Sequence, residues 1–112
     1  MKKIEAIINP FKLEDVKNAL IEVGIEGMTT TDAKGFGNQK GPEEIYRGSD
    51  YTAEFVPMVL ILVVVADSVA ESAVRAIQRA GKTGYIGDGK IFVSTIDEAF
   101  RIRISERGEP PI

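Results

Sequence analysis

A glycine-rich stretch, GYIGDGKIFV at residues 84–93, carries the residue types best suited to bind a charged ligand. Gly84, Gly87 and Gly89 permit positive φ and let a ligand approach the backbone, where consecutive N–H groups can bind an anion. Lys90 adds a positive charge at the point where an apolar run begins. This combination predicts phosphate binding. A tight turn before a solvated strand edge is the alternative, because a glycine loop without a Walker pattern is a weak signal.

Two arginines near the C-terminus can complete such a site. Arg101 and Arg103 are two positions apart in a predicted strand over residues 99–104. Side chains two positions apart leave the same face of a strand, so both guanidinium groups should point one way while the apolar residues between them point the other. Guanidinium groups form paired hydrogen bonds with phosphate oxygens. The arginines, Lys90 and the glycines together form a candidate polyphosphate cradle.

A second flexible stretch covers residues 37–54, which are rich in glycine and charge and show no periodicity. Connections of this length in compact domains are usually functional or disordered. The side chains in its first part that can meet phosphate, a metal or a carboxylate are Asn38, Gln39 and Lys40. Its tyrosines, Tyr46 and Tyr51, suit contact with a partner or modification, although scattered solvated side chains are the simpler interpretation. The acidic residues do not cluster in sequence, so a metal-only or paired-carboxylate site has little support.

The hydrophobic pattern predicts the elements that position these residues. Strands are expected over residues 2–8, 28–36, 57–65, 91–94 and 99–104, and helices over residues 12–23 and from residue 67 onward. Gly24 is expected to end the first helix, and Asp67 or Ser68 to cap the second. The order is β-α-β-β-α-β with a small extra strand, which is typical of the ferredoxin-like α+β sandwich. We expect a single domain over residues 1–112, with a long loop at about 37–55 and a mobile tail at about 105–112.

The third predicted strand is apolar on both faces. Its alternate residues form two sets, Val59, Ile61, Val63 and Val65 on one face and Met58, Leu60, Leu62 and Val64 on the other. Two helices can cover only one face of such a sheet, and a strand that is apolar on both faces is normally buried on both. Another copy of the chain is the simplest cover for the second face. The pattern therefore predicts oligomerisation.

The composition excludes several classes of function. The 112-residue chain has a net charge of −3, which gives no positive field for nucleic acid or acidic membranes. It contains no cysteine and no histidine, which excludes disulfides, thiol catalysis and a phosphohistidine mechanism such as that of a nucleoside diphosphate kinase. Neither a signal peptide nor a membrane-spanning run is evident, so we expect a cytoplasmic protein without direct membrane insertion. The rival interpretations are an acylphosphatase-type enzyme, for which no water-activating pair stands out, and a purely structural assembly.

Five blocks of the sequence carry a more specific signal: NPFKLEDVKNAL, GMTTTDAKGFGNQKG, EIYRGSDY, TGYIGDGKIFV and RIRISERGE. In order and spacing, over the whole chain, they resemble the PII signal-transduction proteins, which regulate nitrogen metabolism. The resemblance implies a homotrimer of ferredoxin-like subunits that binds ATP or ADP in clefts between neighbours and is a regulator rather than an enzyme. It also implies 2-oxoglutarate binding beside Mg²⁺-ATP, and a projecting loop at 37–55 that docks on ammonium transporters and nitrogen-metabolism enzymes.

The same resemblance implies roles for individual residues. Adenine would contact Thr29 and the backbone around Leu62 and Val64. The rest of the nucleotide would contact Gly35, Gly37, Asn38, Gly87, Asp88, Gly89, Lys90, Arg101 and Arg103. Gln39 would help to hold Mg²⁺, and 2-oxoglutarate would contact Gln39, Lys40, Gly41 and the residue at position 58, which is Met58. Tyr51 matches a position that is uridylylated in many proteobacterial members.

Departures from the family pattern concentrate near the phosphates and in the third strand. Asn38 stands where the family usually has arginine, which removes a cation that reaches phosphate. Met58, Leu60 and Leu62 stand where the family usually has lysine, lysine and glutamate, and the lysine replaced by Met58 normally pairs with a carboxylate of 2-oxoglutarate. The resemblance thus implies a largely retained ATP site and a weakened 2-oxoglutarate site. A divergent natural member and a variant with a redesigned central strand both fit these departures.

Overall fold

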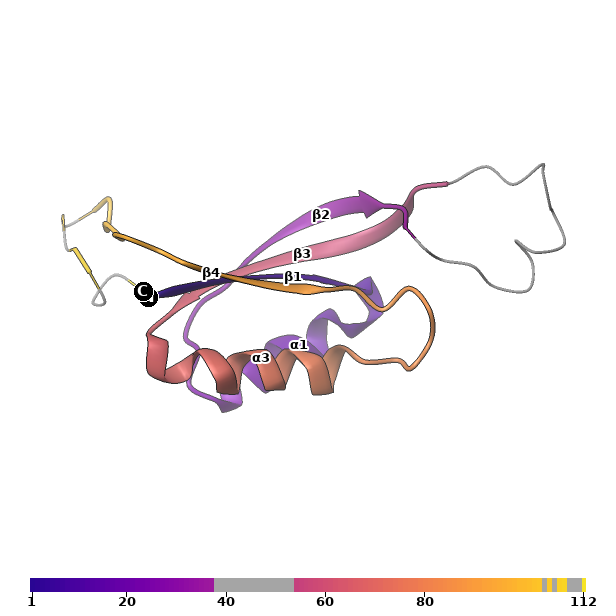
Figure 1. Ribbon diagram of the computed structural model, residues 1–112, viewed down its shortest axis with the longest axis horizontal. Coiled ribbons are helices and arrows are strands. Elements are labelled where there is room, and N and C mark those ends of the chain that lie inside the picture. Colours follow the sequence, from indigo (N-terminus) through magenta and orange to yellow (C-terminus); the bar gives the residue numbers. More distant parts are fainter. Residues whose placement is uncertain (38–53, 104, 106, 109–111) are drawn as a thin grey trace, which may run out of the picture.

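One antiparallel sheet and two helices packed on one of its faces make up the described part of the chain (Figure 1). The computed structural model describes residues 1–37, 54–103, 105, 107–108 and 112. The elements in chain order are β1 (Lys2–Ile8), the short 3-10 helix η1 (Pro10–Lys12), α1 (Leu13–Glu22), β2 (Thr29–Gly35), β3 (Val56–Val65), α3 (Asp67–Gly81) and β4 (Ile91–Thr95). The strand order across the sheet is β2-β3-β1-β4. This arrangement confirms the predicted ferredoxin-like β-α-β-β-α-β order.

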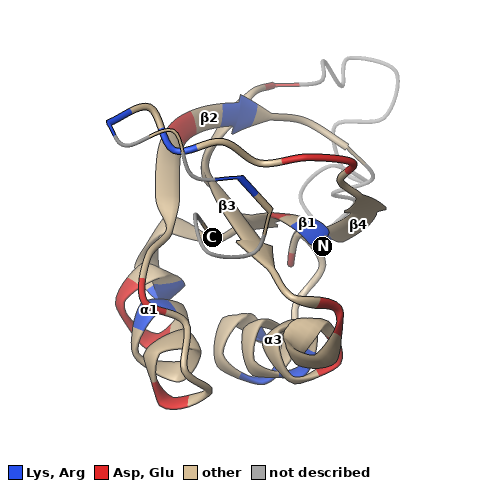
Figure 2. Cartoon of the chain, turned by 90° about the vertical axis from the view of Figure 1, so that its left-hand side faces the viewer, with Lys and Arg blue, Asp and Glu red and all other residues tan. Residues whose placement is uncertain are grey.

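The two helices lie side by side beneath the sheet, with acidic and basic residues on both of them (Figure 2). Gly24 ends α1 as predicted: its φ is +93°, and its N–H donates to the carbonyl of Ile21 at 3.0 Å. The N–H of Ile25 then returns to the carbonyl of Leu20 at 3.0 Å, which satisfies a second carbonyl at the helix end. Neither of these helices is long and apolar enough to cross a lipid bilayer, and the same holds throughout the described residues.

The predicted cap of the second helix is wrong. Ala66 occupies the position before α3 and provides no side-chain hydrogen bond, while Asp67 is the first helical residue. The Asp67 carboxylate instead binds the N-terminal ammonium group of Met1 at 3.0 Å, and this hydrogen-bonded charge lowers the pKa of Asp67. A carboxylate in the first turn also faces the positive end of the helix dipole, so Asp67 still favours the start of α3.

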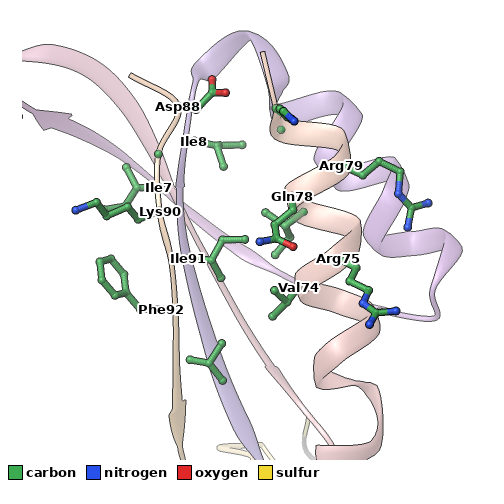
Figure 3. Close-up of a pocket in the computed structure, with 15 residues that line it drawn as sticks. Ile7, Ile8, Val74, Arg75, Gln78, Arg79, Asp88, Lys90, Ile91 and Phe92 are labelled. Atoms are coloured by element: carbon green, nitrogen blue, oxygen red, sulfur yellow. The ribbon is translucent and has the colours of Figure 1, made fainter. Parts of the chain in front are cut away.

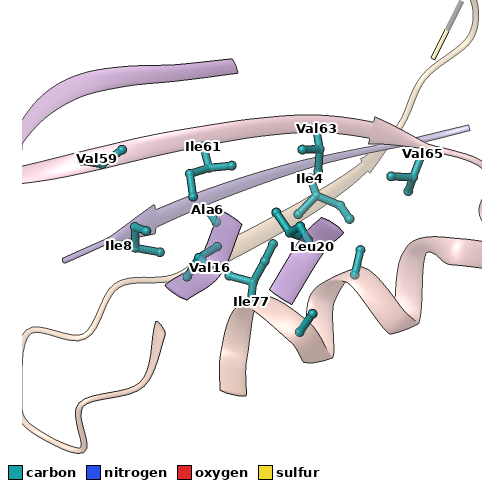
Figure 4. Close-up of a cluster of buried hydrophobic side chains, with 12 residues drawn as sticks. Ile4, Ala6, Ile8, Val16, Leu20, Val59, Ile61, Val63, Val65 and Ile77 are labelled. Atoms are coloured by element: carbon teal, nitrogen blue, oxygen red, sulfur yellow. The ribbon is translucent and has the colours of Figure 1, made fainter. Parts of the chain in front are cut away.

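The hydrophobic core fills the layer between the sheet and the helices (Figure 4). The alternation predicted for β3 is confirmed, because the four residues on its helix-facing side are buried. The core consists of Ile4, Ala6, Ile8, Val16, Leu20, Val59, Ile61, Val63, Val65, Ala73, Ala76 and Ile77. The opposite side of β3 has no layer over it within the described chain. Its residues Met58, Leu60, Leu62 and Val64 are only half-buried, and Phe92 of β4 is 53% exposed.

The predicted strand over residues 99–104 is also wrong within the described residues. Phe100 pairs with Arg107 in an isolated bridge, and the N–H of Ser105 donates to the carbonyl of Arg101 at 3.0 Å. The segment therefore turns back on itself, and Ile102 is fully exposed. The N–H of Ile96 donates to the carbonyl of Met1 at 3.0 Å, and the described residues after Ile96 pair with none of the four strands of the sheet. The expectation that both guanidinium groups leave one strand face is wrong as well.

The junction of β4 with β1 requires a glycine. The N–H of Ile7 donates to the carbonyl of Lys90 at 2.9 Å, which draws the two backbones together. A Cβ atom built on Gly89 would lie 1.5 Å from the carbonyl oxygen of Ile7, a distance that no real side chain tolerates. Gly89 is therefore fixed by close backbone approach, while its neighbours Gly84 and Gly87 have φ of +88° and +104°.

We predict that Gly89→Ala destabilises the chain by roughly 1–3 kcal/mol or more, because the methyl group has no space against Ile7. Gly27→Ala is the matched control, since a Cβ atom there meets nothing within 4 Å. Urea unfolding followed by circular dichroism measures both. Equal stability of the two variants would contradict the close approach of β4 and β1.

A second prediction concerns adjacent residues of α1. Leu20→Ala should lower the free energy of unfolding by about 2–5 kcal/mol, because Leu20 is 1% exposed and its removal leaves a cavity in the core. Ile21→Ala should cost far less, since Ile21 is 58% exposed. The same urea titrations compare them. A similar loss for both variants would show that α1 is rotated about its axis, so that Leu20 and Ile21 are equally buried.

Candidate functional site

The glycine loop, defined here as residues 83–90, connects α3 to β4 and is closed by the side chain of Asp88. One carboxylate oxygen of Asp88 accepts the N–H groups of Thr83 and Gly84, both at 3.0 Å. The other accepts the hydroxyl of Thr83, whose oxygen in turn accepts the N–H of Tyr85 at 3.2 Å. The Thr83 hydroxyl and the Gly84 N–H hold the pKa of Asp88 below its ordinary value, because both stabilise the ionised carboxylate.

These contacts refine the predicted anion site. Two of the loop N–H groups, those of Thr83 and Gly84, are already used by Asp88. The N–H groups of Ile86, Gly87 and Gly89 donate to no group within the described chain and remain available to a ligand. The loop can therefore bind an anion through its second half, next to Lys90.

A hollow of about 960 Å³ lies between α3 and β4, beside the glycine loop (Figure 3). Val74 and Gln78 of α3 point across it toward Ile91 of β4, while Arg75 and Arg79 point away from it. Its walls are mostly apolar, and Arg75 is paired with Glu71 at 2.6 Å.

Lys90 borders this hollow, but its side chain points away from it. Figure 3 shows the side chains of Lys90 and Phe92 on the side of β4 that faces away from α3. Lys90 thus belongs to the sheet face opposite the helices, together with Ile7. We therefore place the ammonium group of Lys90 on the open sheet face, while the backbone of the loop at Gly89 and Lys90 also borders the hollow on the helix side.

Strand register gathers one half of the predicted site at one end of the sheet. Gly35 is opposite Val56, and Met58 is opposite Ala33. The carbonyl of Lys90 accepts the N–H of Ile7 near the end of β1. Two residues after β2, Gly37 lies at the base of the long connection, where Phe36 and Phe55 pack edge to face with centroids 5.0 Å apart. The glycine loop, Lys90, Gly35, Gly37 and Met58 therefore lie toward the same end.

The other half lies toward the opposite end. Thr29 is opposite Leu62, and Val64 is opposite Lys3. Thr95 closes β4 opposite Lys2, and the segment with Arg101 and Arg103 continues beyond it. Figure 1 shows the glycine loop and this C-terminal segment at opposite ends of β4. One chain therefore does not bring the arginines to the glycine loop, and the cradle predicted from their types is not formed within a single copy.

The C-terminal turn has its own structure. Arg107 binds Glu98 at 2.7 Å and lies over the ring of Phe100, with its guanidinium carbon 4.9 Å from the ring centroid. The N–H of Gly108 donates to the carbonyl of Ala99 at 3.0 Å. Arg101 and Arg103 are exposed between these contacts. The turn thus presents two guanidinium groups at the surface, next to the exposed Ile102.

Several predicted residues lie outside the described part of the chain. They are Asn38, Gln39, Lys40, Gly41, Tyr46 and Tyr51, together with residues 38–53 of the predicted loop and residues 106 and 109–111 of the predicted tail. Their predicted roles stay predictions. Among the residues that are described, no three acidic side chains gather as potential metal ligands.

Sequence reasoning missed two features of the candidate site. Thr83 is the partner that closes the glycine loop, and its only signal is its spacing of five from Asp88 in TGYIGD. Lys3 and Glu5 form an ion pair at 3.4 Å on the open face, where Glu5 is opposite both Leu62 and Phe92. The alternation of β1 indicates that both point to that face, but not that they pair.

Comparison with known proteins agrees with this architecture. The family model described as nitrogen regulatory protein P-II matches residues 1–106. The nitrogen regulatory protein P-II of Bradyrhizobium diazoefficiens is 61% identical over 108 residues, and that of Rhodospirillum rubrum is 60% identical, each alignment covering 96% of both chains. A crystal structure of Arabidopsis thaliana PII bound to citrate matches with a TM-score of 0.81 and 37% identity, covering 99% of this chain and 91% of that one. The chain therefore belongs to the nitrogen regulatory protein P-II family.

Proposed function

We propose that this chain is an ATP- and ADP-binding signal-transduction protein that regulates nitrogen metabolism as a homotrimer. One observation carries the proposal: the glycine loop with Lys90 and the turn with Arg101 and Arg103 lie at opposite ends of the same sheet. Each end offers part of a phosphate site, and neither offers all of it. Two copies placed head to tail would bring the two parts together.

The symmetry of such an arrangement supports a ring. A contact between one end of a subunit and the other end of its neighbour is heterologous, and heterologous contacts generate rings when the rotation closes. The open sheet face adds a driving force, because Met58, Leu60, Leu62 and Val64 are only half-buried in the single chain. Covering them would stabilise the assembly by roughly 25 cal/mol per Å² of apolar surface. We infer that three copies close around their open sheet faces.

Within this ring, each nucleotide would contact two subunits. One copy would bind the phosphates through the N–H groups of Gly87 and Gly89 and the ammonium group of Lys90. The next would add the guanidinium groups of Arg101 and Arg103, and its Thr29 with the backbone around residues 62–64 would contact adenine. Mg²⁺ would enter with the phosphates of ATP, partly neutralise their charge and bind Gln39. Charge-assisted hydrogen bonds of this kind are the strong ones in proteins.

The output would be contact with other proteins rather than catalysis. We propose that the stretch at about 37–55 docks on an ammonium transporter or on enzymes of nitrogen metabolism, and that Tyr51 is its modifiable residue. Support comes from the family to which the chain belongs, whose members are named nitrogen regulatory proteins. The absence of histidine and cysteine from the whole sequence argues against the commonest proton-shuttling and thiol chemistries. We place the protein in the cytoplasm.

We further propose that the response to 2-oxoglutarate is weakened. The Arabidopsis relative is bound to citrate, which is a polycarboxylate. In this chain, Met58 lies on the open face at the Gly35 end and offers a thioether in place of an ammonium group. A buried carboxylate without a cationic partner pays a desolvation cost. The ligand's second carboxylate would therefore be poorly compensated.

Mixed trimers test the shared site directly. Lys90→Ala and Arg103→Ala should each weaken ATP binding roughly tenfold or more, because each removes charge-assisted hydrogen bonds to phosphate. When the two variants are mixed and reassembled, about a quarter of the interfaces should pair an intact loop with an intact arginine and regain tight binding. Isothermal calorimetry measures the number of tight sites. A mixture with no tight sites would contradict a site shared between copies.

The effect of Met58 is tested by restoring the cation. Met58→Lys should tighten 2-oxoglutarate binding in the presence of Mg²⁺-ATP by at least about tenfold, since leaving one member of a buried charge pair without its partner costs on the order of 2–5 kcal/mol. Leu60→Lys is the matched control, because it adds the same charge on the same face of β3 but is opposite Thr31, one step farther from Gly35. Low-micromolar binding to the unmodified chain, unchanged by either lysine, would refute the proposal.

A further inference from the structure

We propose that Asp88 and Thr83 are positioning residues: together they close the glycine loop into the shape that receives phosphate, and Asp88 itself does not contact the ligand. This inference rests on the proposed nucleotide binding and deepens it. It reverses the role that the family resemblance implies for Asp88, which is direct contact with the nucleotide. We refer to the contacts between these two residues and Gly84 as the Thr83–Asp88 latch.

The geometry of the latch supports this assignment. Both carboxylate oxygens of Asp88 are turned back into the loop, where they accept two N–H groups at 3.0 Å and one hydroxyl. The backbone N–H of Asp88 also returns to the carbonyl of Tyr85 at 3.3 Å. Three donors on one carboxylate leave it little capacity for a further ligand. An Asp88 bound in this way is held by its own loop.

Charge gives a second argument. An aspartate in the middle of a phosphate site would repel the nucleotide if its charge faced the ligand. Here Thr83 and Gly84 donate hydrogen bonds to the carboxylate. The positive charge of Lys12 in η1 also favours the ionised form of Asp88. The carboxylate can therefore be kept in an anion-binding loop, because its charge is compensated from inside the loop.

The latch has a structural consequence for the ligand-facing half of the loop. It joins the beginning of the loop to residue 88, while Gly89 and Lys90 are fixed against Ile7. Residues 85–87, which the latch encloses, include Gly87 with a φ of +104°. The N–H groups of Ile86 and Gly87 in this segment, and that of Gly89 after it, donate to no group within the described residues and are left for the ligand. A loop ordered before binding loses less conformational entropy when the ligand arrives, which raises affinity.

Four variants of the full chain separate positioning from direct contact. Asp88→Ala and Thr83→Val break the latch, whereas the conservative variants Asp88→Asn and Thr83→Ser should keep it. In Asp88→Asn, one oxygen can still accept both N–H groups while the amide donates to Thr83, and Thr83→Ser retains the hydroxyl. Calorimetry with ATP and with adenosine is the readout, because a loop that positions phosphate should affect ATP and leave adenosine nearly unchanged. Thermal unfolding checks that each variant is folded.

The expected result is that Asp88→Ala weakens ATP binding roughly tenfold, in line with the loss of hydrogen bonds to a charged group, and that Thr83→Val weakens it to a smaller extent. Asp88→Asn and Thr83→Ser should stay within about threefold of the parent chain, and adenosine should bind all of them alike.

Three outcomes would overturn the inference. ATP binding that is unchanged or tighter in Asp88→Ala would show that the carboxylate does not order the loop. A loss in Asp88→Asn as large as in Asp88→Ala would show that the charge itself contacts the ligand through its Mg²⁺ ion. Failure of the parent chain to bind ATP would reject the proposed function, and this inference with it. Failure of the proposed function can be told apart from failure of this inference alone, because ATP binding by the parent chain is measured before any variant is made.

Discussion

The pairing of β1 with β4 is the constraint on which the candidate site depends. At one end of β1, Ile7 bonds Lys90 and its carbonyl leaves room only for glycine at position 89. At the other end, the carbonyl of Met1 accepts the N–H of Ile96, and the described residues after Ile96 join none of the four strands of the sheet. The five residues of β4 therefore separate the glycine loop from the arginine-bearing turn by roughly 16 Å of extended backbone. The sheet itself places the two parts of the proposed phosphate site at opposite ends.

The half-buried face of β3 links the distance between the glycine loop and the arginine-bearing turn to the assembly of several copies. A strand with apolar residues on both faces needs a layer on each side, and the helices cover only the face that carries Ile61 and Val63. If neighbouring copies cover the face with Leu60 and Leu62, the same contact can carry the arginine turn of one copy to the glycine loop of the next. Burial of apolar surface and completion of the ligand site would then depend on one interface. In this account, the apolar residues at positions 58, 60 and 62 strengthen the assembly while they reduce the charge available to a dicarboxylate.

Most of the fold could be predicted from the sequence, because its strands and helices have regular periodicity and clear ends. Gly24 marked the end of α1, and the alternation in β3 identified its buried face. The strand predicted at 99–104 failed for a non-local reason: alternating residues such as Phe100 and Ile102 form a strand only where another strand is available. The cap at Asp67 failed because the N-terminal ammonium group competes for its carboxylate, which no local pattern reveals.

The candidate site was predictable in its residue types but not in its arrangement. Glycine and lysine spacing indicated an anion loop, yet the closure by Thr83 and Asp88 and the separation of Lys90 from Arg103 depend on the folded chain. The central claim is that the nucleotide site exists only between copies. Sedimentation velocity with a fluorescent ATP analogue at micromolar protein tests it most directly. We predict that the analogue sediments with a species of three times the mass of one chain; an analogue that sediments with a stable monomer would contradict the account.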